Sequence, residues 1–172
     1  ECTFYLPPTP DYSSFVGSAS YIPETEATII SKLQSKGISF IHVTNATVID
    51  IFNDTFIKFY NANTSNYSDY YNITEYNEQI EGQMTVYNNF SIVAEVNNKN
   101  QKLLFTGDIY KEAQDNIIDE GLQIPDLLKI EHHGITGVEQ YSEDYVNKYW
   151  FPKIAVGLSK NDNDFIYIRR KA

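Results

Sequence analysis

Two short stretches of the sequence each place metal-ligating side chains directly after an apolar run. The first, residues 103–108, reads Leu-Leu-Phe-Thr-Gly-Asp and ends at Asp108. The second, residues 126–134, reads Asp-Leu-Leu-Lys-Ile-Glu-His-His-Gly and carries His132 and His133. Carboxylate and imidazole are ordinary ligands for zinc, manganese and iron. If both apolar runs are neighbouring strands, their ends aim these side chains at one point above the sheet.

The same residues also have purely structural interpretations. Asp108 fits a turn-forming aspartate, and the histidine pair fits a surface cap on the following loop, since Gly-Asp turns and His pairs are both common. Lys129, inside the second stretch, fits a side chain paired with a nearby carboxylate. His42 lies in the middle of an expected strand and fits a satisfied or surface histidine. Spacing alone leaves these alternatives open.

The elements that must position Asp108 and the histidines alternate between strands and helices, which predicts a mixed α/β class. A helix is expected from Pro23 to the stop signal at Gly37, after an irregular connection over the first 23 residues. Further helices are expected over residues 109–121 and 142–149, the second with Ser142 as its N-cap. Strands are expected over residues 38–43, 47–51, 55–60, 90–96, 102–105, 127–130, 153–158 and 165–169, with a hairpin turn at 97–100 and a long loop at 61–82.

Composition and charge limit the classes of function. The chain has 172 residues, 42% of them hydrophobic, which fits one globular domain with its own core. A net charge of −10 repels phosphate backbones, so a phosphodiester substrate requires cations in the site. The single cysteine, Cys2, excludes an internal disulfide and a multi-cysteine zinc site. No apolar run reaches the roughly 18 residues of a membrane span, and the sequence assigns neither localisation nor oligomeric state.

The two stretches, together with Asn88-Asn89-Phe90-Ser91 ahead of them, resemble the metallo-β-lactamase superfamily. The most similar branch includes the hydrolase domain of competence-type DNA uptake proteins. In that branch an Asn-Asn-x-Ser strand, a Leu-x-Thr-Gly-Asp strand end and a Leu-Lys-x-x-His-His-Gly strand end occur in this order. A later Pro-x-x-Ala-hydrophobic strand is matched by residues 152–156. The resemblance covers residues 85–160, and residues 20–84 by element order only.

The resemblance implies the C-terminal half of an αββα metallo-β-lactamase sandwich and a metal-dependent hydrolase. Asp108 would be the carboxylate that bridges two metals, zinc or manganese, and one of His132 and His133 would be the last imidazole ligand. Which histidine is the ligand stays open, because neighbours along a strand face opposite sides. Asn88 and Asn89 either orient the site or form a plain turn before the strand. The implied substrate is a small-molecule or nucleic-acid ester, attacked by a water that the two metals activate.

The chain departs from the family in one respect. The His-x-His-x-Asp-His motif, which supplies most of the family's ligands, is absent, and none of the three histidines has that spacing. Residues 1–172 are therefore expected to be a single domain that is part of a longer metallo-β-lactamase-fold domain, or else a degenerate member that has lost its metals. Because zinc requires about four ligands, this segment alone is expected to be inactive and to bind metal weakly.

A second hypothesis is a non-catalytic binding module that uses the Tyr- and Asn-rich loop at residues 61–82. Tyr67, Tyr70, Tyr71 and Tyr76 would stack on a sugar or a partner, since aromatic rings with a polar tip suit exposed contacts. A His-x-His-x-Asp-His motif upstream in a longer natural chain would favour the enzyme, and its absence would favour the module.

Overall fold

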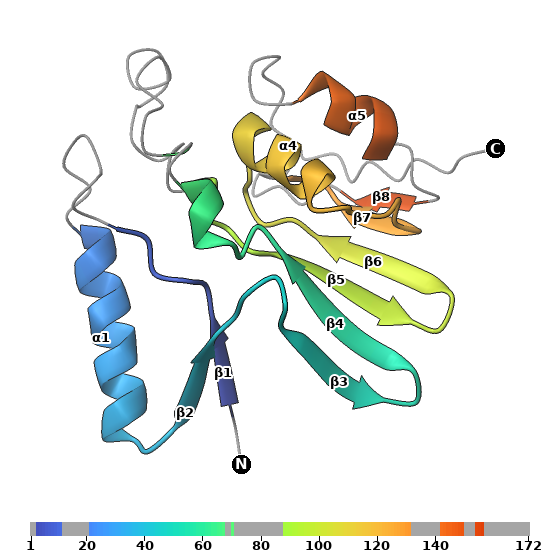
Figure 1. The fold of residues 1–172 in the computed structure, drawn as a ribbon. Helices are drawn as coiled ribbons and strands as arrows, with labels where there is room; N and C mark the ends of the chain where they lie inside the picture. Colours follow the sequence, from blue (N-terminus) through green and yellow to red (C-terminus); the bar gives the residue numbers. More distant parts are fainter. Residues whose placement is uncertain are drawn as a thin grey trace, which may run out of the picture.

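The structure, a computed structural model, describes residues 3–11, 21–67, 70, 88–131, 142–149 and 154–156. The strands form two separate sheets, and helices flank them (Figure 1). The mixed α/β class predicted from the sequence is confirmed. In chain order the elements are β1 (Thr3–Leu6), α1 (Tyr21–Ser35), β2 (Ser39–His42), β3 (Val48–Phe52), β4 (Thr55–Tyr60), the short 3-10 helix η2 (Thr64–Asn66), β5 (Val93–Asn98), β6 (Gln101–Phe105), α4 (Lys111–Asp119), β7 (Leu127–Lys129), α5 (Glu143–Tyr149) and β8 (Ile154–Val156).

The larger sheet has six strands in the order β3-β4-β5-β6-β7-β8. Strands β3 to β6 are antiparallel neighbours, whereas β6, β7 and β8 run parallel to one another. Parallel neighbours need a crossover, and α4 provides it between β6 and β7, while α5 precedes β8. The sequence predicted strands near residues 102–105 and 127–130 with a helix between them. Their adjacency is confirmed.

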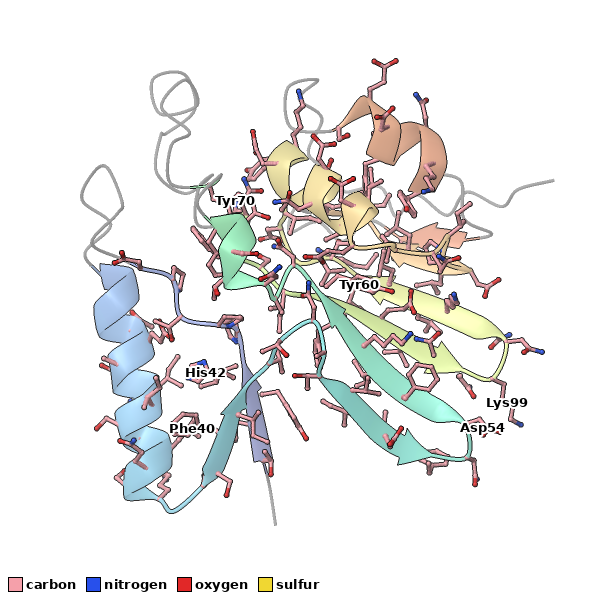
Figure 2. The ribbon with its side chains drawn as sticks, in the orientation of Figure 1. Phe40, His42, Asp54, Tyr60, Tyr70 and Lys99 are labelled. Atoms are coloured by element: carbon pink, nitrogen blue, oxygen red, sulfur yellow. The ribbon has the colours of Figure 1, made fainter. Side chains whose placement is uncertain are left out.

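The two hairpins of this sheet end in tight turns. Asn53 and Asp54 link β3 to β4 with φ angles of 44° and 63°, the left-handed geometry that two-residue hairpins require. Lys99 has a φ of 55° in the β5–β6 turn, which is shorter than the predicted turn at 97–100 because Asn97 and Asn98 still pair with β6. The Lys99 backbone N–H donates to the Asp54 carbonyl at 3.2 Å, so the two tips lie side by side (Figure 2).

One face of the six-stranded sheet carries the main core. Leu104 and Leu128, at the centre of this face, are fully buried, and α4 and α5 lie over it (Figure 1). The core is rich in tyrosine, which explains part of the high tyrosine content of the chain. Its buried residues are Tyr60, Tyr67, Tyr70, Phe90, Val93, Leu104, Ile109, Ala113, Ile117, Leu122, Leu128, Tyr145 and Tyr149.

The opposite face of this sheet is apolar but less covered. Leu103 and Leu127 face each other across β6 and β7 and are half-buried, and Phe105, two residues further along β6, is 46% exposed. Near β4, Val43 and Phe59 form a second, smaller buried cluster on this face. Among the residues that the structure describes, this face therefore remains partly open over β6 and β7.

Strands β1 and β2 form a separate parallel pair, with Thr3 opposite Ser39. The prediction of an irregular connection over the first 23 residues is wrong for Thr3–Leu6, because the strand is defined by pairing with a distant segment and not by local composition. Helix α1 begins at Tyr21, just ahead of Pro23. It ends before Gly37, whose φ of +64° confirms the predicted stop.

His42 has the structural role that its position suggested. Its Nδ1 donates to the Pro7 carbonyl oxygen at 2.7 Å, and its ring meets the edge of Phe40 at 5.8 Å. Both side chains point from β2 toward α1 (Figure 2).

Two further expectations concern the C-terminal part. Ser142 is confirmed as the N-cap of α5, since its Oγ accepts from the Tyr145 backbone N–H at 3.3 Å. The predicted strand at 165–169 lies outside the described residues.

Within the described part, no helix combines the length and apolar composition that crossing a membrane requires.

A polar group of three side chains lies within the main core. Glu95 is 1% exposed; it accepts from Asn97 Nδ2 at 2.7 Å and from the Tyr60 hydroxyl at 3.5 Å. Burial, followed by the nearby charge of Glu95, raises the pKa of Tyr60 to about 12. The phenol is therefore held in its neutral form by the fold.

The raised pKa of Tyr60 predicts a loss of stability in alkaline solution. An unfolded tyrosine ionises near its ordinary pKa of 10.0, but folded Tyr60 keeps its proton to about 12. The contribution of Tyr60 to the free energy of unfolding is therefore complete below pH 10 and is lost as the pH rises through the folded value, by at most about 3 kcal/mol. Urea denaturation of wild type and Tyr60→Phe below and above this window should show the smaller loss in the variant. Equal losses in both proteins would contradict the assignment.

Candidate functional site

The carboxyl end of β6 lies at an edge of the sheet where several segments meet. Because β6 and β7 run parallel and in register, with Phe105 opposite Lys129, both strands end at this edge. The antiparallel neighbours bring the end of β4 and the start of β5 to the same edge, with Tyr60 opposite Val93 and Ala94 opposite Phe105. Asp108 follows β6 directly at this edge.

The turn that presents Asp108 requires glycine at position 107. Gly107 has a φ of +62°, and a Cβ added there would lie 2.7 Å from Ser91 Cβ. The Asp108 backbone N–H donates a long hydrogen bond of 3.5 Å to Ser91 Oγ. The Gly-Asp turn expected from the sequence is confirmed, and its close contact with Ser91, two residues before β5, fixes the position of the Asp108 backbone.

Asp108 is paired with Lys129. The two side chains are 37% and 16% exposed, and Lys129 Nζ lies 3.6 Å from Asp108 Oδ1. The same ammonium donates to the Gly107 carbonyl at 3.0 Å, and Thr106 Oγ1 donates to the Lys129 carbonyl at 2.8 Å. The structural interpretation of Lys129 is therefore confirmed, and its partner is the candidate metal ligand itself.

Asn89 positions the start of α4, just beyond Asp108. It is fully buried; its Oδ1 accepts from the Tyr110 backbone N–H at 2.8 Å, and its Nδ2 donates to Glu112 Oε2 at 2.9 Å. The first N–H groups of a helix lack partners within the helix, so this side chain satisfies one of them. The turn before the strand is confirmed, since the Ser91 backbone N–H donates to the Asn88 carbonyl at 3.0 Å. Within this turn Asn89 also positions the start of α4, and Asn88 Nδ2 donates to the Tyr110 hydroxyl at 3.4 Å.

A second buried amide, Asn61, holds Asn89 in place. Its Nδ2 donates to the carbonyls of Asn89 at 2.6 Å and Ser91 at 2.8 Å, and its Oδ1 accepts from the Tyr70 hydroxyl. Its own backbone N–H donates to Glu120 Oε2 at 2.8 Å. No sequence motif marks Asn61. The one signal was an asparagine directly after a strand, a residue that tolerates the φ of +57° found here.

The tyrosines proposed as an exposed binding surface are only partly described, and those that are described lie in the core. Tyr67 and Tyr70 are 1% and 0% exposed, and their rings pack against Phe90 at centroid distances of 4.7 and 5.3 Å. The prediction that these two residues stack on a ligand is therefore wrong. Tyr71 and Tyr76 lie outside the described residues.

Tyr110 places an uncharged phenol near Asp108. Burial raises the pKa of Tyr110, a hydrogen bond from Asn88 lowers it, and the negative charge of Asp108 raises it. The balance is upward from the ordinary value, so the phenol carries its proton at neutral pH. Asp108 contributes negative charge beside this phenol, and Lys129 offsets the charge of Asp108.

The predicted metal ligands are only partly placed. Asp108 lies at the sheet edge, while His132 and His133 lie outside the described residues. Glu131, directly before them, is buried and accepts from the Tyr145 hydroxyl, so its carboxylate is turned into the core. In the described part, no group of three or more His, Cys, Asp or Glu side chains gathers as metal ligands do. One carboxylate beside an ammonium does not by itself fit a zinc centre, which requires about four ligands.

No model of a known protein family matches the sequence, and no curated protein gives a significant match. The interpretation of this edge therefore depends on its residues and their geometry.

Proposed function

We propose that the chain supplies the C-terminal half of a metallo-β-lactamase-type hydrolase and that Asp108 is one of its metal ligands. The register of β6 and β7 carries this proposal. Leu103 lies opposite Leu127, 24 positions later in the chain, and the following pairs keep this offset. Asp108 and His132 are separated by the same 24 positions in the sequence. The register brings the ends of β6 and β7 to one edge of the sheet, and a carboxylate and an imidazole that follow these two strands would make a suitable pair of ligands.

The two faces of the sheet also support this assignment. Helices α4 and α5 cover one face, whereas the other is apolar over Leu103, Phe105 and Leu127 and partly exposed. A sheet with helices on one face and apolar residues on the other is suited to pack against a second sheet, as an αββα sandwich requires. The order of a hairpin, a helix and a parallel strand is also the order that the resemblance implies.

The proposed substrate is a phosphodiester or another ester. A bound divalent metal, zinc or manganese, would supply Lewis acidity toward such an ester. The described residues hold and orient the carboxylate: Gly107 and Ser91 fix its backbone, and Asn89 fixes the start of the helix that follows. Because the net charge is −10, attraction of an anionic ester depends on cations bound at this edge, where Lys129 already offsets the charge of Asp108.

Titration of the chain with Mn²⁺ tests the assignment of Asp108. We expect a weak site, micromolar or weaker, because the His-x-His-x-Asp-His ligands are absent, and Asp108→Asn should weaken it by at least about tenfold. Asp119→Asn removes the same charge from an exposed position at the end of α4 and should leave the affinity unchanged. The same affinity in wild type and Asp108→Asn would refute the assignment, and nanomolar affinity in wild type would mean that further ligands complete the site.

The enzymatic part of the proposal is tested on the full natural protein. Metal-dependent hydrolysis of an aryl phosphodiester or an aryl ester is expected, and Asp108→Ala should abolish it. Activity that survives this substitution would exclude Asp108 from the reaction.

A further inference from the structure

Asparagines that are followed two positions later by Ser or Thr cluster in one part of the chain. Between positions 45 and 91, six of the nine asparagines have this Asn-x-Ser/Thr pattern, whereas none of the seven elsewhere does. The six are Asn45, Asn53, Asn63, Asn66, Asn72 and Asn89. The pattern is the acceptor motif for N-linked glycans, which are bulky and attach at the protein surface. Each motif therefore depends on whether the fold leaves its asparagine accessible.

The fold separates two of these motifs by accessibility. Asn89 is fully buried, and its Nδ2 donates to Glu112 Oε2 at 2.9 Å, so the folded chain leaves no room for a glycan on this amide. Asn53 is exposed at the tip of the β3–β4 hairpin, next to Asp54, which lies at the outer end of the sheet beside Lys99 (Figure 2). A bulky group on Asn53 can therefore extend into solvent.

Strand β3, which ends beside this tip, is an exposed edge of the six-stranded sheet. Four of its five residues are exposed, and three of these are apolar. Val48, Ile51 and Phe52 are 49%, 47% and 66% exposed. An apolar edge strand is a template for pairing with another chain, and proteins protect such edges with charges, bulges or a covering group. Asp50 and the register irregularity beside it protect the middle of β3, whereas Phe52 at its end lies directly before Asn53.

We propose that Asn53 is an N-glycosylation site and that its glycan covers the exposed end of β3. The amide Nδ2 of Asn53 forms a bond to the anomeric carbon of a glycosyl diphosphate donor. The bond from that carbon to the diphosphate oxygen breaks, the diphosphate leaves, and the nitrogen loses one proton. A glycosyltransferase catalyses this step and recognises the hydroxyl of Thr55, which completes the motif. The hydrophilic glycan then lies beside Phe52 and hinders pairing at the edge. The proposal is independent of the hydrolase assignment.

Glycopeptide mass spectrometry of the full natural protein tests the site. The peptide that contains Asn53 should carry a sugar on this residue, while Asn89 should be unmodified. In the same host, Asn53→Gly, which suits a left-handed turn, and Thr55→Ala should each abolish the modification at this position. Thr55→Ser should retain it, because serine keeps the hydroxyl of the motif. Asn53 without a sugar in the natural protein would overturn the proposal and leave this asparagine with its role in the turn alone.

Sedimentation velocity tests whether the glycan covers β3. Asn53→Gly from the natural host should form at least about twice the oligomer fraction of wild type, and adding Phe52→Ser should reverse this gain. Ile124→Ser is the matched control, since Ile124 is an apolar residue of similar exposure, 56%, that lies before β7 instead of beside Asn53, and it should not reverse the gain. In protein from a host that lacks the modification, wild type and Asn53→Gly should associate equally. Equal association of the two proteins from the natural host would overturn the covering role. Should Asn53→Gly fail to fold, Thr55→Ala makes the same comparison.

Discussion

Gly107→Ala is expected to lower the free energy of unfolding by about 2–5 kcal/mol. A left-handed φ costs a residue with a Cβ about 1–2 kcal/mol, and overpacking adds about 1–3 kcal/mol. Both effects apply at Gly107, since its φ is +62° and an added Cβ would lie 2.7 Å from Ser91 Cβ and 3.1 Å from Ser91 Oγ. Against a total stability of about 5–15 kcal/mol, this loss is large enough to measure by urea denaturation.

Two other glycines separate the conformational cost from the steric one. Gly37 and Gly121 have φ angles of +64° and +83°, but a Cβ added at either position meets no atom within 4 Å. Alanine there should therefore cost only about 1–2 kcal/mol. Ser91→Gly should recover part of the stability of Gly107→Ala, whereas Ser91→Ala should not, because it keeps the Cβ that causes the overlap. Equal losses at all three glycines would contradict this explanation.

Asn89→Asp is the second substitution with a large expected effect. The change keeps the oxygen that accepts from Tyr110 but removes the Nδ2 donor and places a second carboxylate beside Glu112. Asn89 is fully buried, so we expect a loss of about 3–5 kcal/mol in urea denaturation, the cost of breaking a buried interaction and leaving a charge uncompensated. Asn89→Ala should cost less, about 1–3 kcal/mol, because it adds no charge.

The origin of this loss can be checked with a second substitution. Glu112→Gln in the Asn89→Asp background removes the repulsion and should restore part of the stability. Asn100→Asp, in the exposed β5–β6 turn, controls for the general effect of one more negative charge on an acidic protein. If Asn89→Asp is no more harmful than Asn100→Asp, Asn89 does not position the start of α4.

Features encoded locally could be predicted from the sequence. The strand at residues 55–60 has the predicted bounds, and the helix expected over 109–121 is centred on α4, because alternation, helical periodicity and glycine stops are short-range patterns. Strand β1 could not be predicted in this way, since its pairing with β2 depends on a segment far along the chain. The burial of Tyr67 and Tyr70 could not be predicted for a similar reason. A tyrosine surrounded by polar residues has the same local sequence pattern whether its ring is exposed or packs on Phe90.

The residues of the candidate site also divide into those that short sequence patterns predict and those that only the folded chain identifies. Asp108 and its glycine turn follow from a short motif after an apolar run, and the pairing of Lys129 with a carboxylate was one of the expected alternatives. The role of Asn61 was not predictable, because its partners Asn89 and Ser91 lie on the other side of a long connection. Hydrogen bonds between distant segments have no local periodicity, so only the folded chain identifies them.

The proposal that Asp108 and one of His132 and His133 bind the same metal ion can be tested in the imidazole NMR spectrum. The chain has three histidines, so His42, in the separate two-stranded sheet, serves as an internal control. Substoichiometric Mn²⁺ should broaden the Asp108 amide signal together with the ring signals of His132 or His133. His42 should remain sharp, and Asp108→Asn should remove the effect. Broadening that spares both adjacent histidines, or that persists in Asp108→Asn, would contradict the shared site.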